Sequence, residues 1–184
     1  MAAAAAVLFA WTPACRAHSK TPAGPPPPPE VGAHAVPLAL GLETLDRVPT
    51  TLVTLRGARA TVVNFFTTGS DDALLLVDAL AAVDEGWTAY GVRVVGVALD
   101  ANADLVGPYV AGARIPYTVL LATADVREGR SALGPVYAVP LTLVLDAAGR
   151  IRFYHYGIVK LPVLETELDR LRVEATASLA TIRS

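Results

Sequence analysis

Residues 60–73 of the chain are ATVVNFFTTGSDDA. Ala60–Phe66 is rich in β-branched and aromatic residues, which predicts a buried central strand. Ser70 is a favourable N-cap, and Asp71 and Asp72 place negative charge in a first helical turn. The stretch therefore predicts a strand, a short loop and a helix that begins after Ser70. The expected apolar face of this helix is formed by Leu74, Val77, Leu80 and Ala81.

Segments on both sides of this stretch predict more of the same sheet. Leu38–Leu40 and Leu52–Leu55 flank a polar turn at 46–49, which favours a β-hairpin. The remaining strand candidates are Gly91–Asp100, Tyr117–Leu121, Leu141–Asp146 and Ile151–Tyr156. The last two are joined by a turn at 147–150 with Gly149 at a left-handed position.

Helical segments alternate with these strands. They are expected at Ala103–Ala113, which Pro108 ends or kinks, at Asp125–Leu133, and from about Leu161 onward. Strand, helix and strand followed by a hairpin and a closing helix predict an α/β domain with a mixed central sheet.

Composition excludes several kinds of chemistry. The chain has 184 residues, a formal net charge of −2 and a single cysteine, Cys15. This charge gives no electrostatic reason to expect a nucleic-acid partner. One cysteine can form neither an internal disulfide nor a thiolate metal site. We expect no cofactor and no metal; Asp71, Asp72 and Asp78 are interpreted as solvated helix acids.

The N-terminal segment suggests export. Residues 1–11 are an apolar run too short to span a bilayer, and small residues lead from it to Cys15. The segment 1–20 resembles a bacterial lipoprotein signal, with Cys15 as the lipidation candidate and Thr12 where leucine is usual. Plain cleaved secretion, an uncleaved anchor and an alanine-rich start without function are the alternatives.

Residues 21–35 (TPAGPPPPPEVGAHA) are interpreted as a proline-rich linker before a domain at 36–184. Pro25–Pro29 predicts a polyproline II rod of about 15 Å, at about 3.1 Å per residue. Such a spacer suits a domain held near a membrane through an N-terminal anchor or lipid, on the periplasmic side of a bacterial cell envelope. The alternative is an unstructured tail.

Four segments in order resemble the thioredoxin-like family of membrane-tethered thiol–disulfide reductases that includes TlpA and ResA. They are LVTLRG at 52–57, TVVNFF at 61–66, GVRVVGVALD at 91–100 and YAVPLTLVLDAAG at 137–149. The resemblance covers about residues 38–160. It implies a thioredoxin-like fold, with a mixed central β-sheet flanked by helices and an N-terminal β-hairpin.

The chain departs from this family at the active site. In the family the strand ends in Trp-Cys-x-x-Cys at the start of the next helix, whereas this chain has Ser70 and Ala73 at the cysteine positions. Gly69 replaces the tryptophan and Asp72 replaces the proline between the cysteines. Thiol–disulfide exchange needs an attacking thiolate and a resolving thiol, and neither a hydroxyl nor a methyl group supplies them. The resemblance therefore implies a degenerate active site with no catalytic residue.

Pro140 corresponds to the cis-proline of the family, so a cis Val139–Pro140 bond is expected, with a trans proline at a strand start as the alternative. The resemblance implies a peptide-binding groove formed by Val139, Pro140, Gly69 and Phe66. Ser70 is interpreted as an N-cap; its alternative role is a nucleophile or hydrogen-bond donor to a ligand. A copper site at His155, which copper-chaperone relatives of this fold suggest, and a peroxiredoxin activity both lack the necessary cysteines.

Three functions remain open. The first is a redox-inactive module that binds a protein or peptide. The second is a thiol–disulfide oxidoreductase, of the kind used in redox homeostasis or cytochrome c biogenesis, which retains activity through Cys15 or the thiol of a partner. The third is a structural role in which the domain packs against another subunit.

Overall fold

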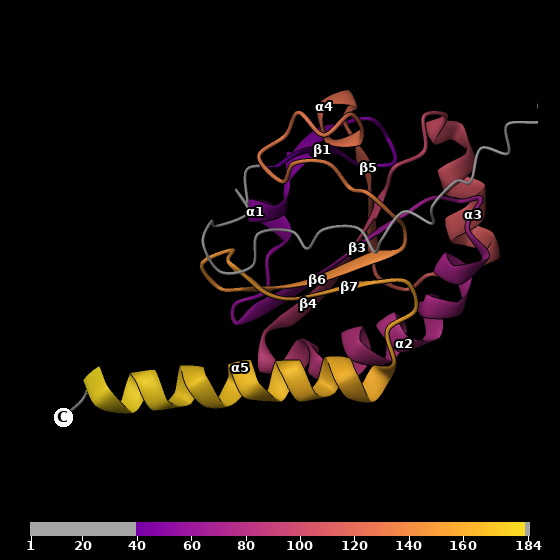
Figure 1. Cartoon of the computed structure of the whole chain (residues 1–184). Coiled ribbons are helices and arrows are strands. Elements are labelled where there is room, and N and C mark those ends of the chain that lie inside the picture. Colours follow the sequence, from indigo (N-terminus) through magenta and orange to yellow (C-terminus); the bar gives the residue numbers. More distant parts are fainter. Residues whose placement is uncertain (1–39, 183–184) are drawn as a thin grey trace, which may run out of the picture.

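The structure is a computed structural model that describes residues 40–182, with side chains up to residue 175. Seven strands form one mixed sheet in the order β2-β1-β5-β4-β3-β6-β7 (Figure 1). The strands are β1 Gly41–Glu43, β2 Pro49–Thr51, β3 Ala60–Phe66, β4 Val92–Ala98, β5 Thr118–Ala122, β6 Leu141–Asp146 and β7 Ile151–Tyr156. The three central strands β3, β4 and β5 are parallel, and β6 and β7 continue the sheet in antiparallel pairing. The predicted mixed α/β architecture is confirmed.

Residues 40–182 also form five helices and two short 3-10 turns, and the last helix follows the last strand. The helices are α1 Leu52–Leu55, α2 Asp71–Trp87, α3 Val106–Gly112, α4 Ala124–Arg127 and α5 Leu161–Ile182. The 3-10 turns are η1 Thr88–Tyr90 and η2 Ala103–Leu105. Among residues 40–182, none of these helices is both long enough and apolar enough to cross a membrane.

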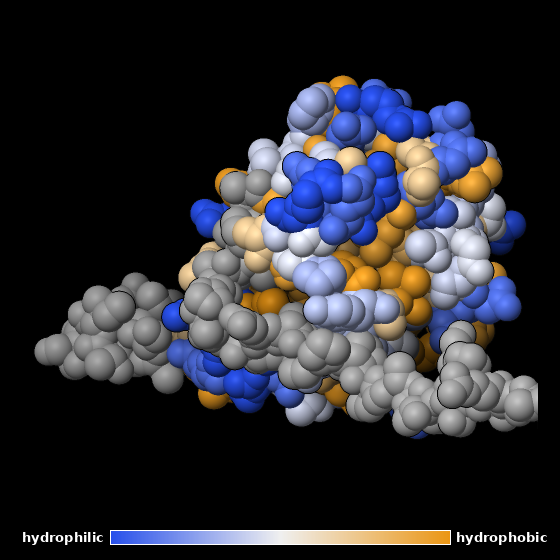
Figure 2. Space-filling view, turned by 45° about the horizontal axis from the view of Figure 1, so that its top comes forward, coloured by the Kyte–Doolittle hydropathy of each residue, from blue (hydrophilic) through white to orange (hydrophobic). Residues whose placement is uncertain are grey.

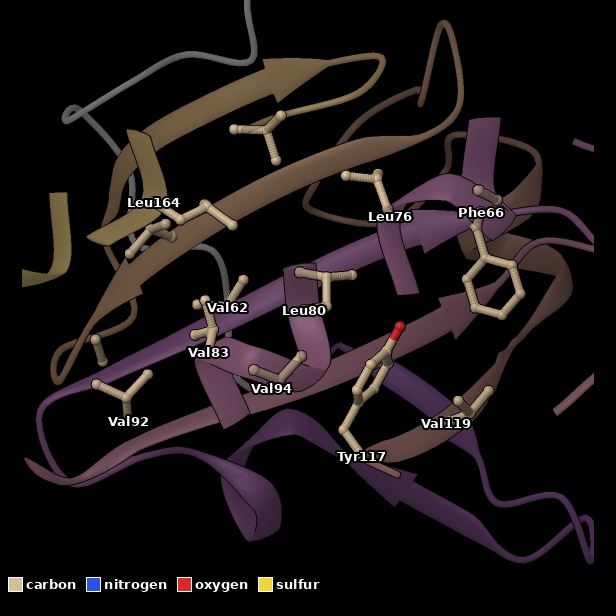
Figure 3. Close-up of a cluster of buried hydrophobic side chains, with 14 of the residues drawn as sticks. Val62, Phe66, Leu76, Leu80, Val83, Val92, Val94, Tyr117, Val119 and Leu164 are labelled. Atoms are coloured by element: carbon tan, nitrogen blue, oxygen red, sulfur yellow. The ribbon is translucent and has the colours of Figure 1, made fainter. Parts of the chain in front are cut away.

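The central strand β3 separates two apolar layers. Val62 and Phe66 contribute to a cluster with buried side chains of α2 and α5, whereas Val63 and Phe65 contribute to a cluster on the other face. Figure 3 shows Leu80 of α2 within the first cluster, near the valines of β3 and β4. Both faces of β3 are buried, which explains why its sequence does not alternate between apolar and polar residues.

Three predictions about single elements are wrong. Leu52–Leu55 forms the short helix α1, because the hairpin is made by the shorter strands β1 and β2 around a tighter turn. Pro108 neither ends nor kinks α3, since it lies in the first turn, where its missing N–H is not needed. The helix predicted at Asp125–Leu133 is only the single turn α4.

The apolar face of α2 also differs from the prediction. Its buried residues include Ala73, Leu76 and Val83, whereas Leu74 is 51% exposed. The hydrophobic periodicity of this helix fits more than one buried face, because three consecutive leucines occupy positions 74–76. Sheet contact decides which side of the helix is buried, and this contact selects Leu76.

The turn between β6 and β7 is organised by a buried carboxylate. Asp146 Oδ1 accepts hydrogen bonds from the backbone N–H groups of Ala148 and Arg150, and Oδ2 accepts from the Arg150 guanidinium at 2.8 Å. Gly149 adopts φ 79°, as predicted for this turn. Burial by itself raises the pKa of Asp146, but the hydrogen bonds from Arg150 and Ala148 outweigh burial and leave the pKa lowered.

This lowered pKa predicts a pH dependence of folding. A carboxyl group with a lower pKa in the folded state stabilises the fold above its unfolded pKa and loses that contribution as the pH falls. We expect the free energy of unfolding to decrease below about pH 4, and to decrease less steeply in Asp146→Asn. Urea unfolding at several pH values measures this slope. Asp78→Asn, an exposed change of the same charge on α2, should keep the wild-type slope; equal slopes in all three proteins would contradict the prediction.

Candidate functional site

The candidate site lies where the ends of three adjacent strands meet. Phe66, the last residue of β3, pairs with Ala98 at the end of β4. Phe65 pairs with Leu141 at the start of β6, so Pro140 lies beside the end of β3. This register brings the loop from β3 to α2 next to the segment before β6, as the family resemblance implies. We call this end of the sheet, on the right in Figure 1, the site end.

Ser70 is the N-cap of α2. Its Oγ accepts the backbone N–H of Ala73 at 3.3 Å, and Asp71 and Asp72 follow in the first turn. The predicted capping role is confirmed. Such a cap stabilises a helix by about 1 kcal/mol. In this geometry the hydroxyl of Ser70 serves as a helix cap.

Among the described residues, no histidine lies beside Ser70 to act as its base. His155 is the one histidine among the described residues, and it lies on the edge strand β7, paired with Thr142. Its ring stacks on Phe153. Nucleophilic catalysis by a serine needs a general base within hydrogen-bond reach, so the arrangement does not favour this alternative.

The loop from β3 to α2 is fixed by Asp100, which follows β4. The Asp100 carboxylate accepts the backbone N–H of Thr68 at 3.1 Å and the Thr68 hydroxyl at 2.6 Å. The hydrogen bond from Leu99 N–H to the Phe66 carbonyl adds a further connection between the two strand ends. A carboxylate that accepts from both donors of one residue ties this loop to the end of β4.

Tyr109 of α3 packs against Phe66, the residue that precedes this loop. Its ring stacks on Phe66 with centroids 5.6 Å apart. Burial and the nearby Asp100 carboxylate raise the pKa of Tyr109, and its buried hydroxyl has no hydrogen-bond partner among the described residues. The phenol is therefore neutral near pH 7.

The segment before β6 has the predicted backbone. The Val139–Pro140 peptide bond is cis, which confirms the prediction. The Pro140 carbonyl accepts the backbone N–H of Gly157 at 2.8 Å. Val139 is half-buried, and its backbone groups have no backbone partner within residues 40–182. Gly69 on the neighbouring loop is exposed, with no atom within 4 Å of where a Cβ would lie.

The described residues offer few groups for metal binding or thiol chemistry. Within the described residues, no three side chains of the His, Cys, Asp and Glu types are arranged to hold a metal ion. The lipidation candidate Cys15, the signal-like segment 1–20 and the linker 21–35 lie outside the described residues. Ser70 and Ala73 stand at the start of α2, where the resemblance places the two cysteines.

The sequence did not point to Asp100 or Tyr109 as site residues. A signal for Asp100 was available: it directly follows an apolar strand, and polar residues at the carboxyl ends of parallel strands meet at one edge. Tyr109 had no such signal, because its contact with Phe66 depends on where α3 packs.

Removing the Asp100 carboxylate should loosen this loop. We expect Asp100→Ala to lower the free energy of unfolding by about 1–3 kcal/mol, because the Thr68 donors lose a charged acceptor. It should also speed hydrogen exchange of the Thr68 amide. Asp104→Ala is the matched control, because Asp104 takes part in an exposed ion pair with Arg47 worth about 0–1 kcal/mol. Equal losses in the two variants would show that Asp100 has no special role.

No protein-family model matches the chain, and no curated protein does. Solved structures do resemble it. A secreted thiol–disulfide isomerase from Corynebacterium glutamicum superposes with a TM-score of 0.64 at 18% identity, covering 73% of this chain and 83% of that one. StoA from Bacillus subtilis gives a TM-score of 0.57 at 15% identity, with coverage of 73% and 99%. A thiol:disulfide interchange protein of the thioredoxin family from Chlorobium tepidum gives 0.56 at 26% identity, with coverage of 78% and 99%.

These similarities cover about three quarters of the chain. They agree with the expectation drawn from the four sequence segments. The chain therefore has the thioredoxin-like fold, and two of these neighbours are described as a thiol–disulfide isomerase and a thiol:disulfide interchange protein.

Proposed function

We propose that this chain is a redox-inactive thioredoxin-like module of the bacterial cell envelope that binds an extended segment of a partner protein at the site end. The observation that carries the proposal is the replacement of both active-site cysteines, with Ser70 used as a helix cap. A fold that keeps its loop geometry without its thiols retains a binding surface but not the exchange reaction.

Exposed apolar side chains support a binding role. Leu75 at the start of α2 is 66% exposed, and Tyr137, three residues before Pro140, is 58% exposed. Both belong to segments at the site end. Figure 2 shows that hydrophobic residues also gather in the middle of the face that it presents, with hydrophilic residues around them. Exposed apolar residues grouped in this way are typical of interaction surfaces.

The backbone near Pro140 suits an extended ligand. Because the backbone N–H and C=O of Val139 have no backbone partner within residues 40–182, they are available to a peptide that lies alongside. Main-chain hydrogen bonds supply affinity in such complexes, and apolar contacts select side chains. Leu75 and Tyr137 favour a segment rich in apolar residues. Asp71 and Asp72 disfavour a segment rich in acidic ones.

The location in the cell envelope rests on the N-terminal sequence and on the neighbours, of which the isomerase from Corynebacterium glutamicum is described as secreted. We propose anchorage through residues 1–20, with lipid attached at Cys15. Metabolic labelling with a radioactive fatty acid, compared between the wild type and Cys15→Ser, tests this anchor. Absence of label from the wild type would contradict it.

A titration tests the binding role. The probe is reduced and alkylated α-lactalbumin, an unfolded protein that offers apolar segments and neither a thiol nor a disulfide. We expect amide signals of Gly69, Ser70 and Val139 to shift in the NMR spectrum, whereas those of Ala148 and Gly149 at the other end of the sheet stay in place.

Two variants make the titration specific. Tyr137→Ser should weaken binding, whereas Val53→Ser, which removes an exposed apolar side chain from α1, should leave it unchanged. No shifts at the site end, or equal effects of both variants, would contradict the proposal and favour a structural role against another subunit.

The second candidate is a thiol–disulfide oxidoreductase that uses Cys15 or the thiol of a partner. It is favoured by the activities named for the structural neighbours. The attacking sulfur would then come from Cys15 or a partner and not from position 70 at the N-terminus of α2, where a helix lowers a thiol pKa. A disulfide-reduction assay with the full chain separates the two candidates.

A further inference from the structure

Three arginine side chains that form no ion pair within residues 40–182 gather at the end of the sheet opposite the site. Arg56 follows α1, Arg59 precedes β3, and Arg93 is the second residue of β4. Most other described arginines form ion pairs, for example Arg150 and Arg152 with Asp146. No described side chain forms an ion pair with any of these three.

The register explains this gathering. Ala60 pairs with Val92 at the starts of the parallel strands β3 and β4, and with Asp146 at the end of β6. The residues before and after these pairs therefore converge. In Figure 1 this end lies on the left, near α1 and the turn from β6 to β7. We call it the basic end.

Arg56 and Arg93 line one hollow at the basic end. The hollow has a volume of about 370 Å³ and lies between α1, β4 and the start of β5. Thr118 contributes an exposed hydroxyl group, and Asp84 contributes the one carboxylate. The two guanidinium groups and this carboxylate leave one net positive charge. Asp84 also accepts the Val94 backbone N–H at 3.3 Å.

The backbone that carries these two arginines is fixed. Gly57 donates its N–H to Thr61 Oγ1 at 3.0 Å and packs so closely against Gly91 that a Cβ at position 57 would lie 2.6 Å from the Gly91 carbonyl oxygen. Arg93 is the single exposed residue of the otherwise buried strand β4. The Arg93 side chain therefore does not contribute to the hydrophobic core.

A second hollow lies nearby. Its volume is about 440 Å³, and its lining includes Arg59, Arg150 and Arg152, together with Asp146 and Glu174. This lining also carries one net positive charge. The two hollows together make the basic end attractive to anions, although the whole chain has a net charge of −2.

We propose that the hollow between Arg56 and Arg93 binds a phosphate-type oxyanion. Guanidinium groups donate paired hydrogen bonds to phosphate oxygens, and Thr118 can add a hydroxyl donor. The volume fits a small phosphorylated molecule or the headgroup of an anionic lipid. The shared chemistry is a phosphate group. The proposal does not rest on the proposed function, because the two sites use opposite ends of the sheet.

The test uses the full chain with inorganic phosphate as the first probe and phosphatidylglycerol vesicles as the second. We expect phosphate in the millimolar range to shift the side-chain Nε–H signals of Arg56 and Arg93 in the NMR spectrum. Arg93→Gln should weaken the apparent affinity at least about tenfold, since it removes a charged hydrogen-bond donor. Arg93→Lys should retain part of the affinity, because the charge stays while the paired donors are lost.

Lys160→Gln is the matched control, because it removes one positive charge at the site end, where Lys160 has no ion-pair partner among the described residues. Its affinity for both probes should equal that of the wild type. A higher affinity for vesicles than for inorganic phosphate, lost in Arg93→Gln, identifies a lipid headgroup as the source of the phosphate group. A higher affinity for inorganic phosphate identifies a soluble ligand. No shift of the arginine signals with either probe, or equal losses in Arg93→Gln and Lys160→Gln, would overturn the proposal.

Discussion

Replacing Ser70 and Ala73 by cysteine is expected to give a chain that forms a reducible internal disulfide. The two positions are the N-cap and the third residue of α2, so their Cα atoms are within the range that a disulfide spans. A cysteine at position 70 should also have a lowered thiol pKa, of about 3.5–7.5, because helix N–H groups and the helix dipole stabilise the thiolate. Made in a Cys15→Ser background, the variant should gain disulfide reductase activity.

The loss of two hydrogen atoms on oxidation, measured by mass spectrometry, checks the disulfide. The rate of thiol alkylation as a function of pH checks the pKa. The matched control is Asp78→Cys with Ala81→Cys, which has the same spacing in the middle of α2 and should show ordinary thiol reactivity. If the cysteines at 70 and 73 do not pair, the loop geometry is not that of a thioredoxin active site.

Replacing Gly57 by alanine is expected to cause the largest loss of stability. The added Cβ would lie 2.0 Å from the Ala60 carbonyl oxygen and 2.6 Å from that of Gly91, so backbone must move. We expect the free energy of unfolding to fall by about 3 kcal/mol or more, and Tm by about 6–12 °C.

Gly86→Ala is the control for this substitution. Gly86 lies in the exposed part of α2, and no atom approaches the place of its added Cβ. Alanine there should stabilise the protein by about 0.5–1 kcal/mol, because glycine is a poor helix former. Thermal unfolding followed by circular dichroism measures both variants, and a neutral Gly57→Ala would show that the start of β3 packs less tightly than described.

Long and strongly patterned segments could be predicted from the sequence. The bounds of β3, β6 and β7 were correct, because their apolar residues are buried and the turn with Gly149 has a strong local preference. The N-cap at Ser70 could be predicted for the same reason: it depends on neighbours along the chain. The cis bond before Pro140 followed from the family resemblance and not from the residues themselves.

Features that depend on tertiary contacts could not be predicted. The buried side of α2 is selected by the sheet, and LLL at 74–76 fits more than one helical face. The role of Asp100 arises only when β3 and β4 end side by side. Arg56 and Arg93 are 37 positions apart in sequence numbering, and only the parallel register of β3 and β4 brings them to one hollow.

The two ends of the sheet suggest a division of roles. The site end carries a fixed loop, exposed apolar residues and a cap in place of a thiol, which suit recognition of a partner protein. The basic end carries Arg56, Arg59 and Arg93, which form no ion pair with a described side chain and line two polar hollows, and this suits a phosphate group. Binding at one end leaves the other accessible.

The proposed absence of thiol–disulfide exchange is tested most directly by a turnover assay. The purified full chain is incubated with insulin and dithiothreitol, and precipitation of the reduced insulin is followed over time. We predict the same rate as in buffer alone, because no described residue can act as attacking or resolving thiol. A rate above buffer that persists in Cys15→Ser, or one that disappears with that substitution, would contradict a redox-inactive module.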